Sequence, residues 1–216
     1  MRCCEKLFRA LICCLLLAAL AAQATDLSVR NPQLTANDDG YSVSADFNIN
    51  FNTRLEEAVN RGVVLYFAVD FELSRSRWYW FEEQIVRRSK TFRLSYHALT
   101  RQYRLSTGAL HQSYATLDDA LSVIERLRNW QVIEKGEVHI DQTYLSSLRM
   151  RLDLSQMAKT FQVSALANRD WNLSSDWVRW LFLPADAVLA AQAGAAPQPT
   201  AAVPTPPAPP AAGDAK

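Results

Sequence analysis

The clearest pattern in the chain is an alternation of apolar and polar residues from Tyr41 to Phe51. Successive side chains of a strand point to opposite faces, so this period of two predicts a half-buried β-strand. Residues 143–154 alternate in the same way. Runs rich in β-branched and aromatic residues predict further strands, at residues 63–73, 78–86, 90–96, 101–105, 161–166 and 176–183.

Capping signals predict two short helices between these strands. Thr53 and Glu56 have the spacing of a capping box, and Gly62 can end a helix over residues 54–61. Thr116, with an acidic first turn behind it, predicts a second helix that ends near residue 128. Many strands at hairpin spacing with two short helices predict a mainly β fold, all-β to α+β: an antiparallel β-sandwich of about seven to nine strands.

The N-terminal residues 1–24 have the order of a secretory signal peptide. Three basic residues precede an apolar run of about a dozen residues, which is shorter than the roughly 20 that a membrane-spanning helix needs. Ala22 and Ala24 supply the small residues of a cleavage site before Thr25. All four cysteines lie within this leader. We therefore expect a mature protein in the periplasm, without disulfides and without a transmembrane segment.

The composition changes again after Ala185, where Ala, Pro, Gln, Thr and Gly dominate. Seven of the nine prolines lie within residues 197–210. Such a segment cannot bury enough apolar surface to offset its ordering entropy. The sequence therefore predicts a single β-sandwich-like domain over residues 25–185 and a disordered Ala/Pro-rich tail over residues 186–216.

Charge is informative through its distribution rather than its total. Without the leader, the chain carries 20 basic and 21 acidic residues, and this near balance indicates no partner. From Arg75 to Arg104, however, eight basic residues stand against two glutamates, and an aromatic run lies within the same stretch. This stretch predicts a binding surface, with the candidate residues Arg87, Arg88, Arg93, Tyr96, His97, Arg101, Tyr103, Arg104, Trp78 and Trp80. The alternative is that these arginines pair internally and cover apolar surface with their stems.

Signatures of catalysis are missing from the sequence. The mature chain has no glycine-rich phosphate loop, no nucleophile elbow and no paired-histidine zinc helix. His139 and Asp141 could begin a metal site, but no third ligand accompanies them. We therefore expect no cofactor and no metal, and favour a protein that is not an enzyme.

Four runs carry a resemblance to a known family: "RSRWYWFEEQIV", "TFRLSYHALTRQYRLSTGALHQSYATLDDAL", "VIERLRNWQVIEKGE" and "FQVSALANRDWNLSSDWVRWLFL". They resemble the bacterial domain-of-unknown-function family 4390 across nearly the whole region from residue 25 to residue 183. Its members look like exported proteins without an assigned activity, with genes near a membrane sensor kinase. The resemblance implies a role in the cell envelope and transfers no catalytic residue.

The leading hypothesis is an exported, non-enzymatic envelope module that uses the basic and aromatic surface, with a link to membrane signalling. Its partner would be an anionic envelope component or a protein, such as a membrane sensor kinase, and not a nucleic acid. One alternative is a hydrolase or transferase that acts on an envelope polymer, with His97, His111, Arg101 or Tyr103 in its site. Another is a carrier of a hydrophobic ligand, which requires an apolar cavity between the sheets.

Overall fold

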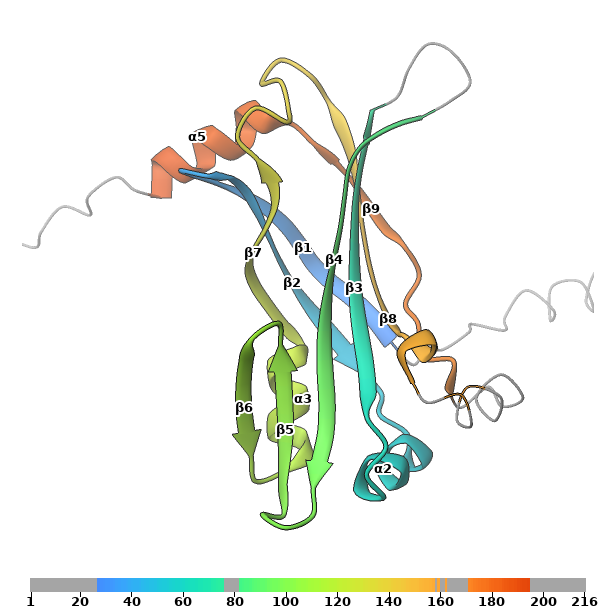
Figure 1. Cartoon of the computed structure of the whole chain (residues 1–216). Helices are drawn as coiled ribbons and strands as arrows, with labels where there is room; N and C mark the ends of the chain where they lie inside the picture. Colours follow the sequence, from blue (N-terminus) through green and yellow to red (C-terminus); the bar gives the residue numbers. More distant parts are fainter. Residues whose placement is uncertain (1–26, 76–81, 158, 160–161, 163–170, 195–216) are drawn as a thin grey trace, which may run out of the picture.

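A computed structural model describes residues 27–75, 82–157, 159, 162 and 171–194. Its strands form two antiparallel sheets that pack as layers (Figure 1). Sheet A has the order β1 (Leu27–Asn37), β2 (Gly40–Ile49) and β7 (Arg126–Glu134). Sheet B has the order β6 (Leu110–Tyr114), β5 (Gln102–Thr107), β4 (Glu83–His97), β3 (Leu65–Arg75), β8 (Tyr144–Leu152) and β9 (Val178–Phe182). The prediction of a mainly β, antiparallel sandwich is confirmed, with nine strands in the described residues.

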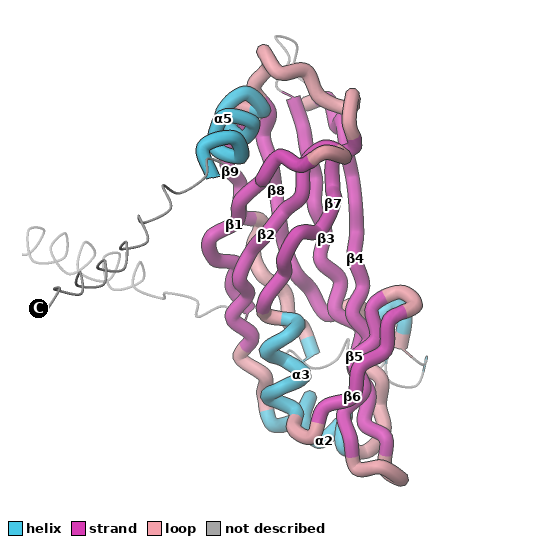
Figure 2. Tube along the Cα trace, turned by 90° about the vertical axis from the view of Figure 1, so that its left-hand side faces the viewer, coloured by secondary structure: helices cyan, strands magenta, loops and turns pink. Residues whose placement is uncertain are grey.

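Three helices and one 3-10 turn complete the described structure: α2 (Thr53–Asn60), α3 (Leu117–Ile124), α5 (Pro184–Gly194) and the turn Leu154–Gln156. Helix α5 lies at one end of the sandwich, and α2, α3 and the β5–β6 hairpin lie at the other (Figures 1 and 2). Among these helices, none is long and apolar enough to cross a membrane.

The helix starts follow the capping signals closely but not fully. Thr116 caps α3 as predicted, and its side chain accepts a hydrogen bond from the Asp119 amide at 3.1 Å. The cap of α2 is Asn52, whose Oδ1 accepts from the Leu55 amide at 2.9 Å, so Thr53 is the first helical residue instead. Helix α3 also ends at Ile124, earlier than expected, because the chain then enters β7 and pairs with β2.

Strand β4 departs most from the sequence prediction. It is one continuous strand of 15 residues, where the pattern predicts two separate strands at 78–86 and 90–96. Different neighbours hold its two parts, because β3 pairs along most of its length and β5 pairs only from Phe92 onward. Strands β1, β6 and β7 were not predicted, since many of their side chains are exposed and polar. The strand expected at 161–166 lies outside the described residues except for Gln162.

The core is built around β3, the strand paired with β4 on one side and β8 on the other. Alternate residues of β3 face sheet A and are fully buried: Leu65, Phe67, Val69, Phe71 and Leu73. They meet buried residues of β2 in sheet A, such as Val43 and Phe47. The period of two therefore turns the remaining residues of β3 toward the opposite side of sheet B.

Helix α5 extends the described structure beyond Ala185, where the composition predicts the end of the folded region. It contacts β1, Pro184 is buried, and Ala187 and Val188 pack against the core. Apolar contact with the sandwich thus holds a segment whose alanines also favour a helix. Residues 1–26 and 195–216, which include the expected signal peptide and most of the expected tail, lie outside the described residues.

Candidate functional site

The two faces of sheet B have opposite character. One is the apolar face that packs on sheet A, and we call the other the outer face. Because paired residues of neighbouring strands point the same way, the strand register identifies the outward positions. Six arginines from four strands occupy them: Arg87 and Arg93 of β4, Arg104 of β5, Arg149 and Arg151 of β8, and Arg179 of β9.

Asp70 of β3 neutralises part of this outer face. It is only 8% exposed, and its Oδ1 accepts a hydrogen bond from Ser89 Oγ at 2.9 Å. Its Oδ2 accepts from Arg149 Nε at 3.1 Å and from Arg151 Nε at 3.0 Å. Burial alone raises the pKa of Asp70, but the hydrogen bonds from Ser89, Arg151 and Arg149 outweigh it and hold the pKa below its usual range. Asp70 is therefore ionised and paired at neutral pH.

Further contacts hold both β8 arginines in place. The Arg149 guanidinium lies 4.3 Å from the centre of the Trp177 ring, in cation–π geometry. Arg151 Nη1 lies 3.2 Å from Asp153 Oδ1. The partners of these two arginines thus come from the protein itself, and we interpret this cluster as structural.

Arg93 and Arg104 have no such partners. Both side chains are exposed, and within the described residues neither has a carboxylate at ion-pair distance. Arg93 stands opposite Ser106 and Arg104 opposite Ser95, so the two arginines are diagonal neighbours on adjacent strands. We call these two arginines, with Ser95, Ser106, His111 and Ser113, the arginine patch.

The hydroxyl and imidazole groups of the patch surround its two cations. Ser106 faces His111 across the β5–β6 pair, and Ser106 Oγ lies 2.7 Å from His111 Nδ1. Ser113 stands opposite Arg104 on the other side. The outward positions of β5 and β6 carry no acidic residue. Such an array of cations and neutral donors on a sheet is suited to binding a carboxylate or a phosphate.

Strand β4 places the basic residues of the sequence stretch on both faces of sheet B. Arg87 lies on the outer face and pairs with Glu72 at 3.0 Å, although its side chain remains 65% exposed. Arg88 points the other way, and its Nη2 lies 3.0 Å from Glu137 and 3.7 Å from Glu134. Arg88 is therefore held by acidic residues at the end of β7 and in the turn after it, and it lies apart from the arginine patch.

The predicted tyrosines also face inward. The rings of Tyr96 and Tyr103 pack with their centres 5.0 Å apart, and the Tyr103 hydroxyl donates to Asn60 Oδ1 at 2.6 Å. Burial, reinforced by the nearby Tyr96 and Glu56, raises the pKa of Tyr103. This pair anchors β5 to helix α2 and does not reach the arginine patch.

The remaining candidates lie near the β4–β5 turn or cannot be placed. His97 is on the outward side at the end of β4, with Nδ1 3.2 Å from Thr100 Oγ1. Arg101 is exposed in the turn with a φ of 52°. Trp78 and Trp80 lie outside the described residues. Of the eight candidates that the structure describes, Arg93 and Arg104 are the two cations that lie together and have no acidic partner in the described part of the chain.

Sequence reasoning missed Asp70, Arg149 and Arg151. A usable signal was present, because Arg149 and Arg151 flank Met150 in a segment whose alternation predicts a strand. Polar positions of an alternating strand share one face, so these arginines could have been assigned to the face opposite the core. The contact of Asp70 with these arginines could not be predicted from the sequence, because Asp70 lies 79 and 81 positions away from them in the chain.

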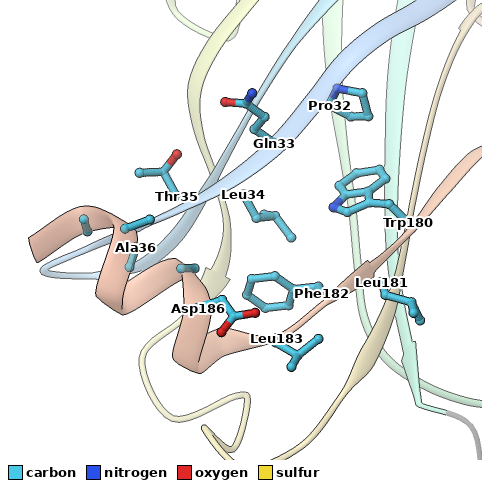
Figure 3. Close-up of a pocket in the computed structure, with 13 residues that line it drawn as sticks. Pro32, Gln33, Leu34, Thr35, Ala36, Trp180, Leu181, Phe182, Leu183 and Asp186 are labelled. Carbon is cyan, nitrogen blue, oxygen red and sulfur yellow. The ribbon is translucent and has the colours of Figure 1, made fainter. Parts of the chain in front are cut away.

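A separate apolar groove of about 810 Å³ lies between β1, β9 and α5. Figure 3 shows Leu34 of β1 and Phe182 of β9 pointing toward each other within it, with Trp180 beside them. On the side of α5 the lining residues are mainly alanines, whose small side chains leave the groove open. This groove is open and lies where β1 and β9, the edge strands of the two sheets, meet α5, so it differs from an enclosed cavity between the sheets.

Among the described residues, no group of three or more histidines, cysteines, aspartates or glutamates is placed to hold a metal ion.

Neither the curated proteins nor the solved structures contain a match to this chain. A family model does match, over residues 24–181, and its description is a domain of unknown function (DUF4390). Since the match covers most of the sequence, including all strands of both sheets except the last residue of β9, the chain belongs to the DUF4390 family.

Proposed function

We propose that this protein is an exported, non-enzymatic binding module whose arginine patch binds an anionic partner in the cell envelope. The observation that carries the proposal is the pair Arg93 and Arg104, two exposed cations side by side that have no acidic neighbour among the described residues. The contrast with Asp70 supports it, because the same sheet neutralises the arginines of β8 from within. Unpaired arginines on a rigid sheet can bind a carboxylate or phosphate with little loss of backbone entropy.

The hydrolase or transferase alternative needs an acid–base pair, and the described residues favour it less. The side-chain partners of His97 and His111 are the hydroxyls of Thr100 and Ser106, not carboxylates. Tyr103 points inward to Asn60, whereas His97 and His111 lie on outward positions, so these groups do not converge on one point. A binding role needs no such convergence.

The double variant Arg93→Gln and Arg104→Gln is expected to bind poly-L-glutamate about tenfold more weakly than the unmodified protein, because each glutamine removes one cation from the patch. Titration calorimetry at 0.1 M salt measures this. Affinity should also fall toward 1 M salt, where the screening length shrinks from about 10 Å to about 3 Å. The free energy of unfolding, measured by thermal denaturation, should change by no more than about 0.5 kcal/mol.

A matched control removes the same charge elsewhere. Arg61, which caps the C-terminus of α2, and Arg126 of β7 are exposed, so the double variant Arg61→Gln and Arg126→Gln lowers the net charge equally. It is expected to change the affinity by less than about twofold. Equal weakening in both double variants would assign the binding to net charge, and unchanged binding in the patch variant would refute the proposal outright.

A second candidate function is favoured by the groove alone. If it holds an acyl chain, Leu34→Glu should abolish the binding of palmitate, because a carboxylate then enters an apolar wall. Leu99→Glu is the control, since Leu99 is 92% exposed in the turn between β4 and β5 and does not line the groove. Tryptophan fluorescence during palmitate titration measures the difference. Equal titration curves for both variants would remove this candidate.

A further inference from the structure

The edges of the two sheets are not equally protected. An unpaired strand edge can add a strand from another chain, and proteins commonly block it with bulges, prolines or charges. In β1, Pro32 lies within a register shift between Arg30 and Gln33. In β7, the pairing with β2 shifts twice, and Asn129 has a φ of 48°. Both edges of sheet A are therefore irregular and poorly suited to further pairing.

Strand β6 is the outermost strand at one edge of sheet B and lacks these protections. Its five residues pair with β5 without a register shift, and they include no proline and no lysine. Four of the five side chains are exposed. No described element lies beyond it in the sheet order (Figure 1). The edge of β6 is thus regular, uncharged and accessible.

The turn before β6 determines which backbone groups face outward. Gly108 and Ala109 form a two-residue turn, with Gly108 at a φ of 57° and Thr107 paired with Leu110. Residues that flank such a turn exchange hydrogen bonds, and bonded and non-bonded pairs then alternate along the hairpin. The amide and carbonyl groups of His111 and Ser113 consequently point away from β5 toward the free edge.

Charge near this edge selects the kind of segment that would fit it. A strand added beside β6 would lie about 10 Å from β5, which is two strand spacings. An extended arginine and a glutamate can together span that distance, so Arg104 can reach an outward carboxylate of the added strand. On the inward side the added strand would meet Leu110, which is 61% exposed. Carboxylates alternating with apolar residues would satisfy both sides.

The other regular edge, at β9, does not offer this combination. Its only outward cation is Arg179, and Arg179 shares a small hollow with Glu72 and Glu82. These two carboxylates would repel an acidic strand. At β6 the cations of the arginine patch stand without acidic neighbours on the outward positions of β5 and β6.

We infer that the edge of β6 docks an extended acidic segment of a partner protein, which adds to sheet B as a further strand and places its carboxylates against the arginine patch. This inference rests on the proposed function and names its partner class. Main-chain hydrogen bonds to His111 and Ser113 supply the affinity, and Arg104 and Arg93 supply the preference for acidic sequences.

The test uses a nine-residue peptide in which glutamate alternates with valine, and the same peptide with lysine in place of glutamate. Ser113→Pro removes the outward amide of Ser113, and a proline is tolerated where the amide of an edge strand faces solvent. The variant is expected to bind the acidic peptide about tenfold more weakly, while the matched control Ser113→Ala stays within about twofold. The lysine peptide is expected to bind neither the unmodified protein nor the two Ser113 variants.

Poly-L-glutamate separates this inference from the proposed function. Ser113→Pro and Ser113→Ala should bind poly-L-glutamate equally, because both lose the Ser113 hydroxyl and both keep Arg93 and Arg104. If Ser113→Pro and Ser113→Ala bind the acidic peptide equally while the Arg93→Gln and Arg104→Gln variant loses poly-L-glutamate, the strand-addition inference is wrong and the proposed function stands. If the patch variant binds both probes like the unmodified protein, both are wrong.

Amide hydrogen exchange supplies a measurement that does not depend on a proline substitution. In the unmodified full chain, the acidic peptide should slow the exchange of the His111 and Ser113 amides and leave that of Gln112, already paired with β5, unchanged. Unprotected His111 and Ser113 amides in the presence of saturating peptide would overturn the inference. A dimer of the free protein that Ser113→Pro dissociates would also overturn it, by assigning the edge to a second copy.

Discussion

Replacing Gly40 with alanine is expected to destabilise the protein by about 4 kcal/mol, which lowers the melting temperature by about 10 °C. Gly40 begins β2 with a φ of +134° and pairs with Glu134 of β7. An added Cβ would lie 2.9 Å from the Glu134 carbonyl carbon, and closer still to the Ile133 carbonyl oxygen. Backbone atoms cannot yield as a flexible side chain can, so β2 and β7 would have to separate. Thermal unfolding by circular dichroism measures the loss.

Gly62→Ala is the matched control for this change. Gly62 also has a positive φ, of +88°, but an added Cβ would meet no atom within 4 Å. Gly62→Ala should lower the free energy of unfolding only by the conformational penalty of a positive φ, about 1–2 kcal/mol. The difference between the two variants therefore isolates the close contact of β2 with β7. Equal losses would show that this contact contributes nothing and that φ alone sets the cost.

Asp70→Asn is expected to destabilise the protein by about 2–3 kcal/mol at pH 7, which lowers the melting temperature by about 5–10 °C. The change leaves Arg149 and Arg151 beside a neutral amide. Their side chains are 28% and 34% exposed, so solvent screening keeps the loss below that of a fully buried ion pair. Chemical denaturation of both proteins measures it.

The same pair of proteins should show a defined dependence on pH. The pKa of Asp70 is lower in the folded protein than the value of about 3.9 expected when unfolded. The stability that ionised Asp70 contributes is therefore complete above about pH 5 and is lost as the pH falls through the folded pKa. The gap between the unmodified protein and Asp70→Asn should close in acid. A gap that is the same at pH 7 and pH 3 would contradict this account.

Glu72→Gln is the control for the Asp70 variant. Glu72 lies on the same outer face and pairs with Arg87, whose side chain is 65% exposed. Exposed ion pairs contribute about 0–1 kcal/mol, so this variant should unfold almost as the unmodified protein does. A loss as large as that of Asp70→Asn would indicate that charge on the outer face, rather than burial of Asp70, controls stability.

Local patterns in the sequence determined much of the fold. The alternation in β2 and β8 predicted strands with one buried face, since side chains of a strand alternate whatever surrounds them. The Thr116 cap located the start of α3. The family resemblance also follows from the amino-acid sequence alone, and the family match over residues 24–181 confirms it. These features depend on residues close together in the chain.

The candidate site could be predicted only in part. The basic stretch pointed to Arg93 and Arg104, but it also included Arg88, which turns inward to Glu137. Neighbouring residues of a strand point to opposite faces of the sheet. Charged residues that are close in sequence therefore lie together in space only when they are separated by an even number of positions. Because β4 was predicted as two separate strands, the sequence did not show which of its residues point to the same face of the sheet.

Which segments become neighbours depends on contacts between residues far apart in the chain. The tertiary structure placed β8 beside β3, so that Asp70 met Arg149 and Arg151, and it left β6 at the edge of sheet B with the arginine patch next to it. Hairpin signals specify consecutive strands, but the order of a sheet follows from burying the apolar faces of all strands together. In this protein, local sequence was enough to predict which residues of β2 and β8 alternate and where α3 begins. The strand order within sheet B placed Arg149 and Arg151 beside Asp70 and left Arg93 and Arg104, among the described residues, without an acidic partner.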